Sequence, residues 1–341
     1  MTAAAQESPP PPVKASPIVE TGGFAGTRRS RFPAVRPPGY FSPDADPAAL
    51  AAFFKANGYL VMEDAFTSAE VAEMKGETTR ICRGERGALS GVDLPPAGAS
   101  EEQVLGHFLC VHFPHKISPI MRSTLFNPPT LKALTTVIGP NVKFMQSMLF
   151  IKASGKPGQA WHQDEDYIMT RDRSLLGSWI GLDRATQENG CLWVIPGSHR
   201  PGILWEQRWH GDRRFDCAEE SVGFPYTDAD AIPVEVEAGS VVFFQGYLLH
   251  RSLPNRAPAG TYRRALVNHY MSCESLLPWH KPAENEPMAK VDYRDIIVVA
   301  GTDPYAYRGT KEIAKPVVRP AGDGGCASWN TKNLPYKDDP E

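Results

Sequence analysis

The sequence predicts a mainly β protein with flanking helices, arranged as a β-sandwich or jelly roll. After residue 140, short apolar segments recur, each bounded by turn signals such as GKPG, QENG and LPNRAPAG. Proline accounts for 32 of the 341 residues, nearly twice the usual share of about 5%, and this disfavours long helices. All-β domains of about 200–250 residues often form one domain, so the length does not require two.

A helical lead-in comes before the β region. Asp46 or Asp44 is expected to cap a first helix that stops at Gly58, and Thr67 or Ser68 to open a second helix. The expected elements are a helix at 49–58, a strand at 59–66, a helix at 68–84, a Gly/Pro-rich loop at 84–103 and a helix at 128–137.

Strands dominate the chain from residue 140 onward. Their apolar residues are rich in Val, Ile, Phe and Trp, which favour a pleated, half-buried surface. The expected strands are 142–152, 160–167, 175–183, 191–197, 232–237, 240–245 and 263–271. No internal repeat is found, so these strands are expected to build one β unit.

The domain organisation follows from shifts in composition. Residues 1–45 hold nine prolines and few large apolar groups, so this segment is expected to be disordered. One domain is expected at 46–280, with the helical lead-in at 46–140 and the jelly-roll core at 141–275. Residues 281–341 are expected to wrap over the core and to end in a loose tail.

Composition excludes several classes of protein. The net charge of −3 and the pI of about 6.3 argue against a nucleic-acid or anionic-membrane binder, which needs a basic face. No apolar run approaches the length of about 20 residues that a membrane helix needs. The six cysteines are scattered without a CxxC pair, so free thiols are expected. These features predict a cytoplasmic enzyme or binding protein.

The segment Trp161-His162-Gln163-Asp164 carries the strongest chemical signal. On a strand, residues i and i+2 point to the same face, so His162 and Asp164 would project together into the barrel. A distant His250, next to the strand at 240–245, would complete two histidines and one carboxylate. This facial triad leaves open positions and is characteristic of non-haem Fe(II) oxygenases. Six other histidines are expected to be structural, loop or lid residues, with a substrate contact as the alternative for His199: His107, His112, His115, His199, His210 and His280.

Seven blocks of the sequence resemble the phytanoyl-CoA dioxygenase family of Fe(II)- and 2-oxoglutarate-dependent oxygenases. The blocks are QSMLFIK (146–152), WHQD (161–164), SWIGLD (178–183), NGCLWVIPGSH (189–199), AGSVVFFQG (238–246), HRSLPN (250–255) and RRA (263–265). The resemblance covers about two-thirds of the chain. It implies a double-stranded β-helix, a cupin-like jelly roll, with iron held at one mouth.

The resemblance also implies the principal site residues. His162, Asp164 and His250 match the iron ligands, and Arg263 matches the arginine that binds the distal carboxylate of the cosubstrate 2-oxoglutarate. Arg264 is the rival for that role, and strand alternation would send it to the other face, pointing outward from the cavity.

Further pocket positions follow from the same matches. Ser252 matches a hydroxyl beside the distal carboxylate, and Met148, Gln163 and Trp179 match positions of the cosubstrate pocket. Gln146 resembles a cosubstrate contact, and an ordinary polar barrel residue is an equal alternative.

The expected chemistry fits these residues. The keto-acid end of 2-oxoglutarate can chelate Fe(II) at two open positions and leave one for O₂. Its far carboxylate needs a buried planar cation, which an arginine supplies through a bidentate, charge-assisted pair. Turnover would release succinate and CO₂ and oxidise a small-molecule substrate.

The substrate is less defined by the sequence. The long connection between the strands at 197 and 232 is expected to be a lid or a surface loop pinned by Trp205 and Trp209. Residues 205–220 hold three arginines against five acids, a poor cradle for the phosphates of CoA. A small metabolite is therefore the expected substrate for hydroxylation. The alternatives are desaturation, epimerisation or acyl-CoA hydroxylation on the same scaffold, and a non-catalytic jelly-roll binding protein.

Overall fold

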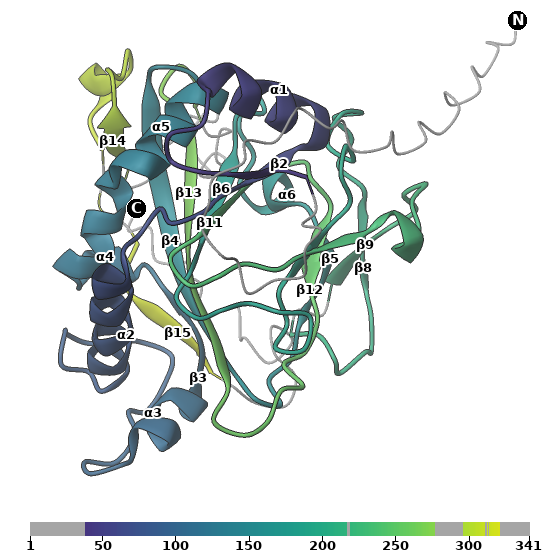
Figure 1. The fold of residues 1–341 in the computed structure, drawn as a ribbon. Helices are drawn as coiled ribbons and strands as arrows, with labels where there is room; N and C mark the ends of the chain where they lie inside the picture. Colours follow the sequence, from purple (N-terminus) through teal and green to yellow (C-terminus); the bar gives the residue numbers. More distant parts are fainter. Residues whose placement is uncertain (1–37, 217–218, 277–295, 311, 313, 321–341) are drawn as a thin grey trace, which may run out of the picture.

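The computed structural model describes residues 38–216, 219–276, 296–310, 312 and 314–320. Within these residues the chain forms three layers: helices, a large sheet and a small sheet (Figure 1). The helices are α1 (Pro47–Asn57), α2 (Ser68–Cys82), α3 (Glu101–His107), α4 (Pro119–Ser123), α5 (Pro128–Val137) and α6 (Asp164–Tyr167). This arrangement confirms the expected mainly β fold with flanking helices.

The large sheet has nine strands in the described part of the chain. Its order is β1-β2-β11-β6-β13-β4-β3-β15, and β14 pairs with β4. The strands are β1 (Tyr40–Phe41), β2 (Tyr59–Met62), β3 (Phe108–His112), β4 (Val142–Ala153), β6 (Leu176–Gly181), β11 (Val241–Gln245), β13 (Tyr262–Ser272), β14 (Ile297–Ala300) and β15 (Val317–Pro320). All pairs are antiparallel except β1 with β2.

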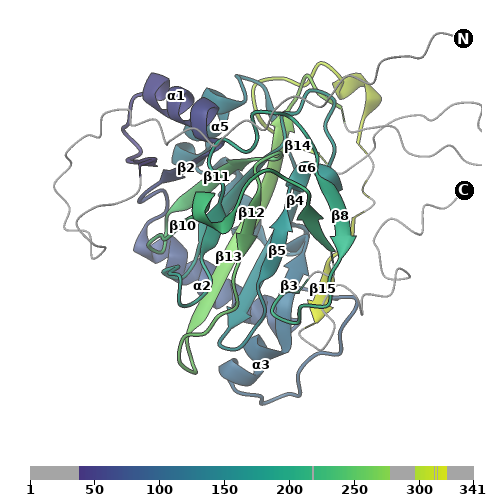
Figure 2. The ribbon, with the colours of Figure 1, turned by 90° about the vertical axis from the view of Figure 1, so that its right-hand side faces the viewer.

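The small sheet faces the large one and has the order β10-β7-β12-β5. Its strands are β5 (Gln159–His162), β7 (Leu192–Val194), β10 (Ile232–Val234) and β12 (His250–Ser252). Beside it, β8 (Glu206–Trp209) and β9 (Glu219–Val222) form a separate antiparallel hairpin. Figure 2 shows the small sheet and this hairpin in front of the large sheet. Two facing antiparallel sheets are the architecture of a jelly roll.

The helix signals in the sequence are confirmed. The Asp46 side chain accepts a hydrogen bond from the backbone N–H of Ala48, and Gly58 ends α1 in the left-handed conformation with φ 79°. Thr67 and Glu70 form a capping box at the start of α2.

Several expectations were wrong in detail. The strand expected at 160–167 ends at His162, and Asp164 opens the short helix α6. The loop expected at 84–103 gives way to α3 at Glu101, because Ser100 and Gln103 form a capping box. The connection 197–232 contains the β8–β9 hairpin, and Trp209 is 71% exposed, so it pins nothing.

The terminal segments are only partly described. Residues 1–37 and 277–295 lie outside the described residues, as does the tail from 321. Of the expected disordered segment, Tyr40–Phe41 instead form β1 beside β2. The expected wrap includes β14 and β15, which extend the large sheet through β4 and β3.

Helices α2, α4 and α5 cover the outer face of the large sheet (Figure 1). One apolar cluster spans these helices and both sheets. Four cysteines are buried as free thiols, namely Cys82, Cys110, Cys191 and Cys273. None of the helices in the described ranges is long and apolar enough to cross a membrane.

Candidate metal centre

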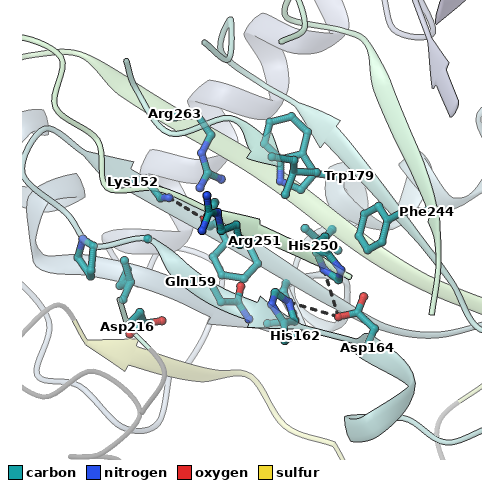
Figure 3. A pocket seen from close by; sticks show the side chains of 18 of the residues that line it. Lys152, Gln159, His162, Asp164, Trp179, Asp216, Phe244, His250, Arg251 and Arg263 are labelled. Carbon is teal, nitrogen blue, oxygen red and sulfur yellow. Dashed lines mark hydrogen bonds and ion pairs between the residues drawn. The ribbon is translucent and has the colours of Figure 1, made fainter. Parts of the chain in front are cut away.

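A cavity lies between the two sheets, and side chains of both sheets line it. From the large sheet come Leu109, Met148, Phe150, Lys152, Trp179, Phe244, Arg263, Val267 and His269, and from the small sheet Gln159, His162, Leu192, His250, Arg251 and Ser252. Pro157, Gly158, Asp164 and Asp216 complete the lining. Figure 3 shows His162, Asp164 and His250 at one end of this cavity, and Lys152 and Arg263 at the other.

His162 and His250 are cross-strand neighbours on β5 and β12. Their ring centroids lie 4.0 Å apart. The Nδ1 of His162 bonds to the carbonyl of Ala160 at 2.8 Å, and that of His250 to the carbonyl of Leu248 at 2.9 Å. Because a carbonyl only accepts, each Nδ1 carries the proton and each Nε2 keeps a lone pair for a metal.

Asp164 supplies the third ligand atom. Its Oδ1 lies 3.6 Å from Nε2 of His162 and 3.6 Å from Nε2 of His250. The three residues are buried, and their ligand atoms all lie within 4.8 Å of one another. The helical turn that begins at Asp164 points its carboxylate toward both histidines. Asp164 therefore lies close to His162 although it is not part of the same strand.

The electrostatics favour the metal-binding forms of these side chains. Burial, together with His250, lowers the pKa of His162 to about 3, so this imidazole is neutral at neutral pH. Burial alone would raise the pKa of Asp164, but the neighbouring histidines His250, His269 and His162 outweigh it and lower that pKa. A neutral imidazole and an ionised carboxylate are the forms that bind metal ions.

A third histidine holds the second oxygen of Asp164. His269, on β13, is buried, and its Nε2 donates to Asp164 Oδ2 at 2.8 Å. Its Nδ1 then accepts a weaker hydrogen bond from Gln146 Nε2 at 3.4 Å. With Oδ2 engaged, Oδ1 is the oxygen left facing the two histidines. Such partners of a ligand usually fix its orientation.

Arg263 lies at the other end of the cavity and is 3% exposed. Its guanidinium sits 5.4 Å from the centre of the Trp179 ring. Burial lowers the pKa of Arg263 to about 10, which still leaves it charged at neutral pH. Among the described residues, its Nε has no hydrogen-bond partner. A buried cation with an open donor is suited to an anionic ligand.

Ser252 and Lys152 lie beside this arginine. Lys152 on β4 lies directly opposite Arg263 on the neighbouring strand β13. Its ammonium donates to Ser252 Oγ at 2.9 Å and to the carbonyl of Leu253 at 2.8 Å. These three side chains give this end of the cavity a cluster of hydrogen-bond donors.

The structure brings most of the predicted site residues together. Met148, Trp179, Ser252 and Arg263 line the same cavity as the three candidate ligands. Gln146 and Gln163 are not among the lining residues.

Gln163 instead ties the connection 197–232 to the core. Its amide donates to the carbonyls of Ile203 and Tyr247 and accepts from the backbone N–H of Trp205. It therefore holds the backbone around the candidate ligands.

Sequence reasoning missed Lys152 and His269. Both carried a signal, since Lys152 is four residues after Met148 and His269 six after Arg263. Even spacings on one strand place side chains on one face. The missed Asp216 had no such signal, because it lies in an irregular connection.

Two of the other histidines have structural partners. His115 Nδ1 bonds to Ser147 Oγ at 2.6 Å, and burial lowers the pKa of His115 to about 3. His199 Nε2 bonds to the carbonyl of Lys55 at 3.2 Å, which ties the turn after β7 to α1. His280 lies outside the described residues.

Comparison with known sequences gives one family match and several relatives. The family model for phytanoyl-CoA dioxygenase (PhyH) matches residues 54–265. Phytanoyl-CoA dioxygenase 1 of Oryza sativa subsp. japonica is 29% identical over 259 residues, which cover 67% of this chain and 90% of the rice protein. The peroxisomal phytanoyl-CoA dioxygenase of Rattus norvegicus is 27% identical over 274 residues, covering 73% of this chain and 74% of the rat protein.

Among solved structures, the chain resembles the epimerase SnoN in complex with Fe3+, alpha ketoglutarate and nogalamycin RO. The TM-score is 0.53 at 20% identity, and the match covers 72% of this chain and 93% of SnoN. At this identity the likeness concerns the fold alone.

Proposed function

The chain belongs to the phytanoyl-CoA dioxygenase family, and on this premise we propose that it is an Fe(II)- and 2-oxoglutarate-dependent dioxygenase that hydroxylates a small organic molecule. The observation that carries the proposal is the buried set of His162, Asp164 and His250, whose ligand atoms lie within 4.8 Å of one another. Two imidazoles and one carboxylate suit Fe(II) and leave open positions for further ligands.

The residues present fit both groups. His162 and His250 would bind the iron through Nε2, because their Nδ1 protons are engaged by backbone carbonyls. Arg263 and Ser252 would hold the distal carboxylate of 2-oxoglutarate at the far end of the cavity. Iron bound with 2-oxoglutarate and O₂ supplies the oxidising power, with succinate and CO₂ as coproducts.

The chain itself contributes orientation and the exclusion of water. His269 fixes Asp164, and the ring of Phe244 packs 4.7 Å from that of His250. Trp179, Val267 and Leu192 give the cavity apolar walls. Low solvent access protects an oxidising site from side reactions.

The β8–β9 hairpin supports a small substrate rather than an acyl-CoA. Arg208 is paired with Glu206, and Arg214 with Asp212, in exposed ion pairs. These arginines are therefore already neutralised by acids of their own segment, which leaves them poorly suited to bind CoA phosphates. Epimerisation or desaturation on the same scaffold is the second candidate, because the structurally similar SnoN is an epimerase. The cytoplasmic location stays a prediction, since the rat relative is named as peroxisomal.

A metabolite screen tests the proposal. The Fe(II)-loaded protein is incubated with 2-oxoglutarate, O₂ and a library of small molecules, and succinate and product masses are followed by mass spectrometry. We expect substrate-dependent succinate release with a product heavier by one oxygen. A product of unchanged mass would indicate epimerisation, and a loss of two hydrogens would indicate desaturation. Absence of iron binding and of succinate release would contradict the proposal.

A further inference from the structure

Two buried basic side chains lie side by side at the end of the cavity away from the candidate metal ligands. Lys152 and Arg263 are cross-strand partners on β4 and β13. They are 4% and 3% exposed, and both line the cavity. Burying one cation is costly, and burying two neighbours adds their mutual repulsion. Consistent with this, burial and Arg263 both lower the pKa of Lys152.

The hydrogen bonds of Lys152 determine how Ser252 can act. The ammonium only donates, so Ser252 Oγ must be the acceptor of the 2.9 Å bond between them. The second bond of Lys152 goes to the carbonyl of Leu253, also a neutral acceptor. The hydroxyl proton of Ser252 is therefore directed away from Lys152. Because Ser252 lines the cavity, this proton is available to an acceptor inside it.

The backbone at Gly190 passes close to the amino group of Lys152. Gly190 has φ +85°, and a Cβ there would lie 3.1 Å from Nζ of Lys152 and would clash with the carbonyl of Leu253. The backbone carbonyl of Lys152 itself accepts from the Asn255 amide at 3.0 Å. The two hydrogen bonds of Lys152 Nζ, to Ser252 Oγ and to the carbonyl of Leu253, hold it in place without a ligand.

We propose that Lys152 is a positioning residue for the distal carboxylate of the cosubstrate. Its hydrogen bond to Ser252 turns that hydroxyl into a donor toward the cavity, next to Arg263, so the pocket selects a keto acid that ends in a carboxylate. The inference rests on the proposed function, because it names the group that this end of the cavity recognises.

Two keto acids of equal chain length test this role. 2-Oxoglutarate and 2-oxovalerate share the chelating end, but 2-oxovalerate ends in a methyl group. Their affinities are measured anaerobically on the Fe(II)-loaded protein for the wild type and for Lys152→Met. We expect Lys152→Met to lower the affinity for 2-oxoglutarate by about 10- to 100-fold, as for a lost charged hydrogen bond. The affinity for 2-oxovalerate should change less than about twofold, because its terminal methyl group offers no hydrogen-bond acceptor.

Controls separate positioning from packing. Lys143→Met removes another buried lysine of β4, which bonds to the carbonyl of Ser275 and lies outside the cavity lining, and should leave both affinities unchanged. In the double variant Lys152→Met/Ser252→Ala, the loss should be smaller than the product of the two single losses, because Lys152 acts partly through Ser252. Lys152→Gln serves as the neutral variant if Lys152→Met does not fold.

Three outcomes are decisive. An equal loss of affinity for both keto acids would assign Lys152 a packing role and overturn the inference. An unchanged affinity for both keto acids would also overturn it. If the wild-type protein binds iron but neither keto acid, the proposed function fails instead, so the two failures are distinguishable.

Discussion

Arg263 and Arg264 are consecutive residues of β13, and their guanidinium groups lie on opposite faces of the large sheet. Arg263 lines the cavity against Trp179. Arg264 forms a two-point ion pair with Asp183, at 2.8 and 2.9 Å, and Asp183 also pairs with Lys75 of α2. Arg264 points away from the cavity, as strand alternation predicted, and it is only 9% exposed. One arginine is available to a ligand, and the other joins the sheet to a helix.

This relationship gives a paired prediction. Arg263→Met should weaken 2-oxoglutarate binding by about 2–5 kcal/mol, the usual cost of removing one partner of a buried charge pair. Arg264→Met should leave that affinity nearly unchanged and lower the free energy of unfolding. Anaerobic ligand titration and urea denaturation separate the two effects. Equal losses of affinity in both variants would mean that the strand register at β13 does not determine the ligand contact.

The carboxylate ligand gives a second prediction. Asp164→Glu keeps the charge but lengthens the side chain by one methylene, and the buried turn at α6 should tolerate the new position poorly. Asp164→Gly removes the carboxylate and keeps both histidines. We expect both variants to lose substrate-dependent succinate release by orders of magnitude, with the iron content measured in parallel. Full activity in Asp164→Gly would exclude Asp164 as a ligand.

A third prediction concerns the hydrogen bond from His269 to Asp164. His269→Phe should lower the affinity for Fe(II) by about 10- to 100-fold, the usual effect of losing the partner that orients a ligand. Gln146→Leu should have a smaller effect, since its bond to His269 is long at 3.4 Å.

The control for this prediction is His115→Phe. It replaces a buried histidine that bonds to Ser147, away from the cavity, and it should not change the affinity for iron. Competition with a coloured chelator provides the measurement. An unchanged affinity in His269→Phe would show that Asp164 is oriented by its own helical turn alone.

A fourth prediction concerns pH and stability. Burial alone would raise the pKa of Asp183, but hydrogen bonds from Arg264 and Lys75 outweigh it and lower that pKa. A lowered pKa in the folded state adds stability above the unfolded value of about 3.9, and this contribution is lost as the pH falls through the folded pKa. Asp183→Asn should cost about 3–5 kcal/mol at pH 7, as for a broken buried pair.

The difference in unfolding free energy between wild type and Asp183→Asn should therefore shrink as the pH falls below the unfolded pKa of about 3.9. Urea denaturation at several pH values measures it. Asp212→Asn is the matched control, because its ion pair with Arg214 is exposed and such pairs add little. A difference that stays constant with pH would contradict the assigned role of Asp183.

Much of the fold could be predicted from local signals. Asp46 and Gly58 bound α1, and Pro128–Val137 form a helix, because caps and prolines act on their own neighbours. The turn at Asp164 could not be predicted, because the alternation of the strand gives no sign of where pairing stops. The burial of Arg264 also escaped prediction, since it depends on Asp183, 81 residues away.

The candidate metal ligands could be predicted because a His-x-Asp segment is followed by a distant histidine, in the order shown by the family that the sequence resembles. His162, Asp164 and His250 gather as the family resemblance implied, although Asp164 lies on α6 and not on the strand of His162. Lys152 acts through Ser252 and His269 through Asp164, and these partners lie 100 and 105 residues away in the chain. Single-strand periodicity gives the face on which a side chain lies, but not the residue that it meets.

The proposed function requires that His162, Asp164 and His250 bind iron in a form that chelates 2-oxoglutarate. The most direct test is the visible spectrum of the anaerobic Fe(II)-loaded protein, recorded before and after 2-oxoglutarate is added. We expect a weak charge-transfer band in the wild type and in the control His107→Ala, whose ring bonds to the carbonyl of Asp93. The band should be absent in His162→Ala and His250→Ala. A wild-type protein that binds iron but shows no band, or a band that survives in His250→Ala, would contradict the account.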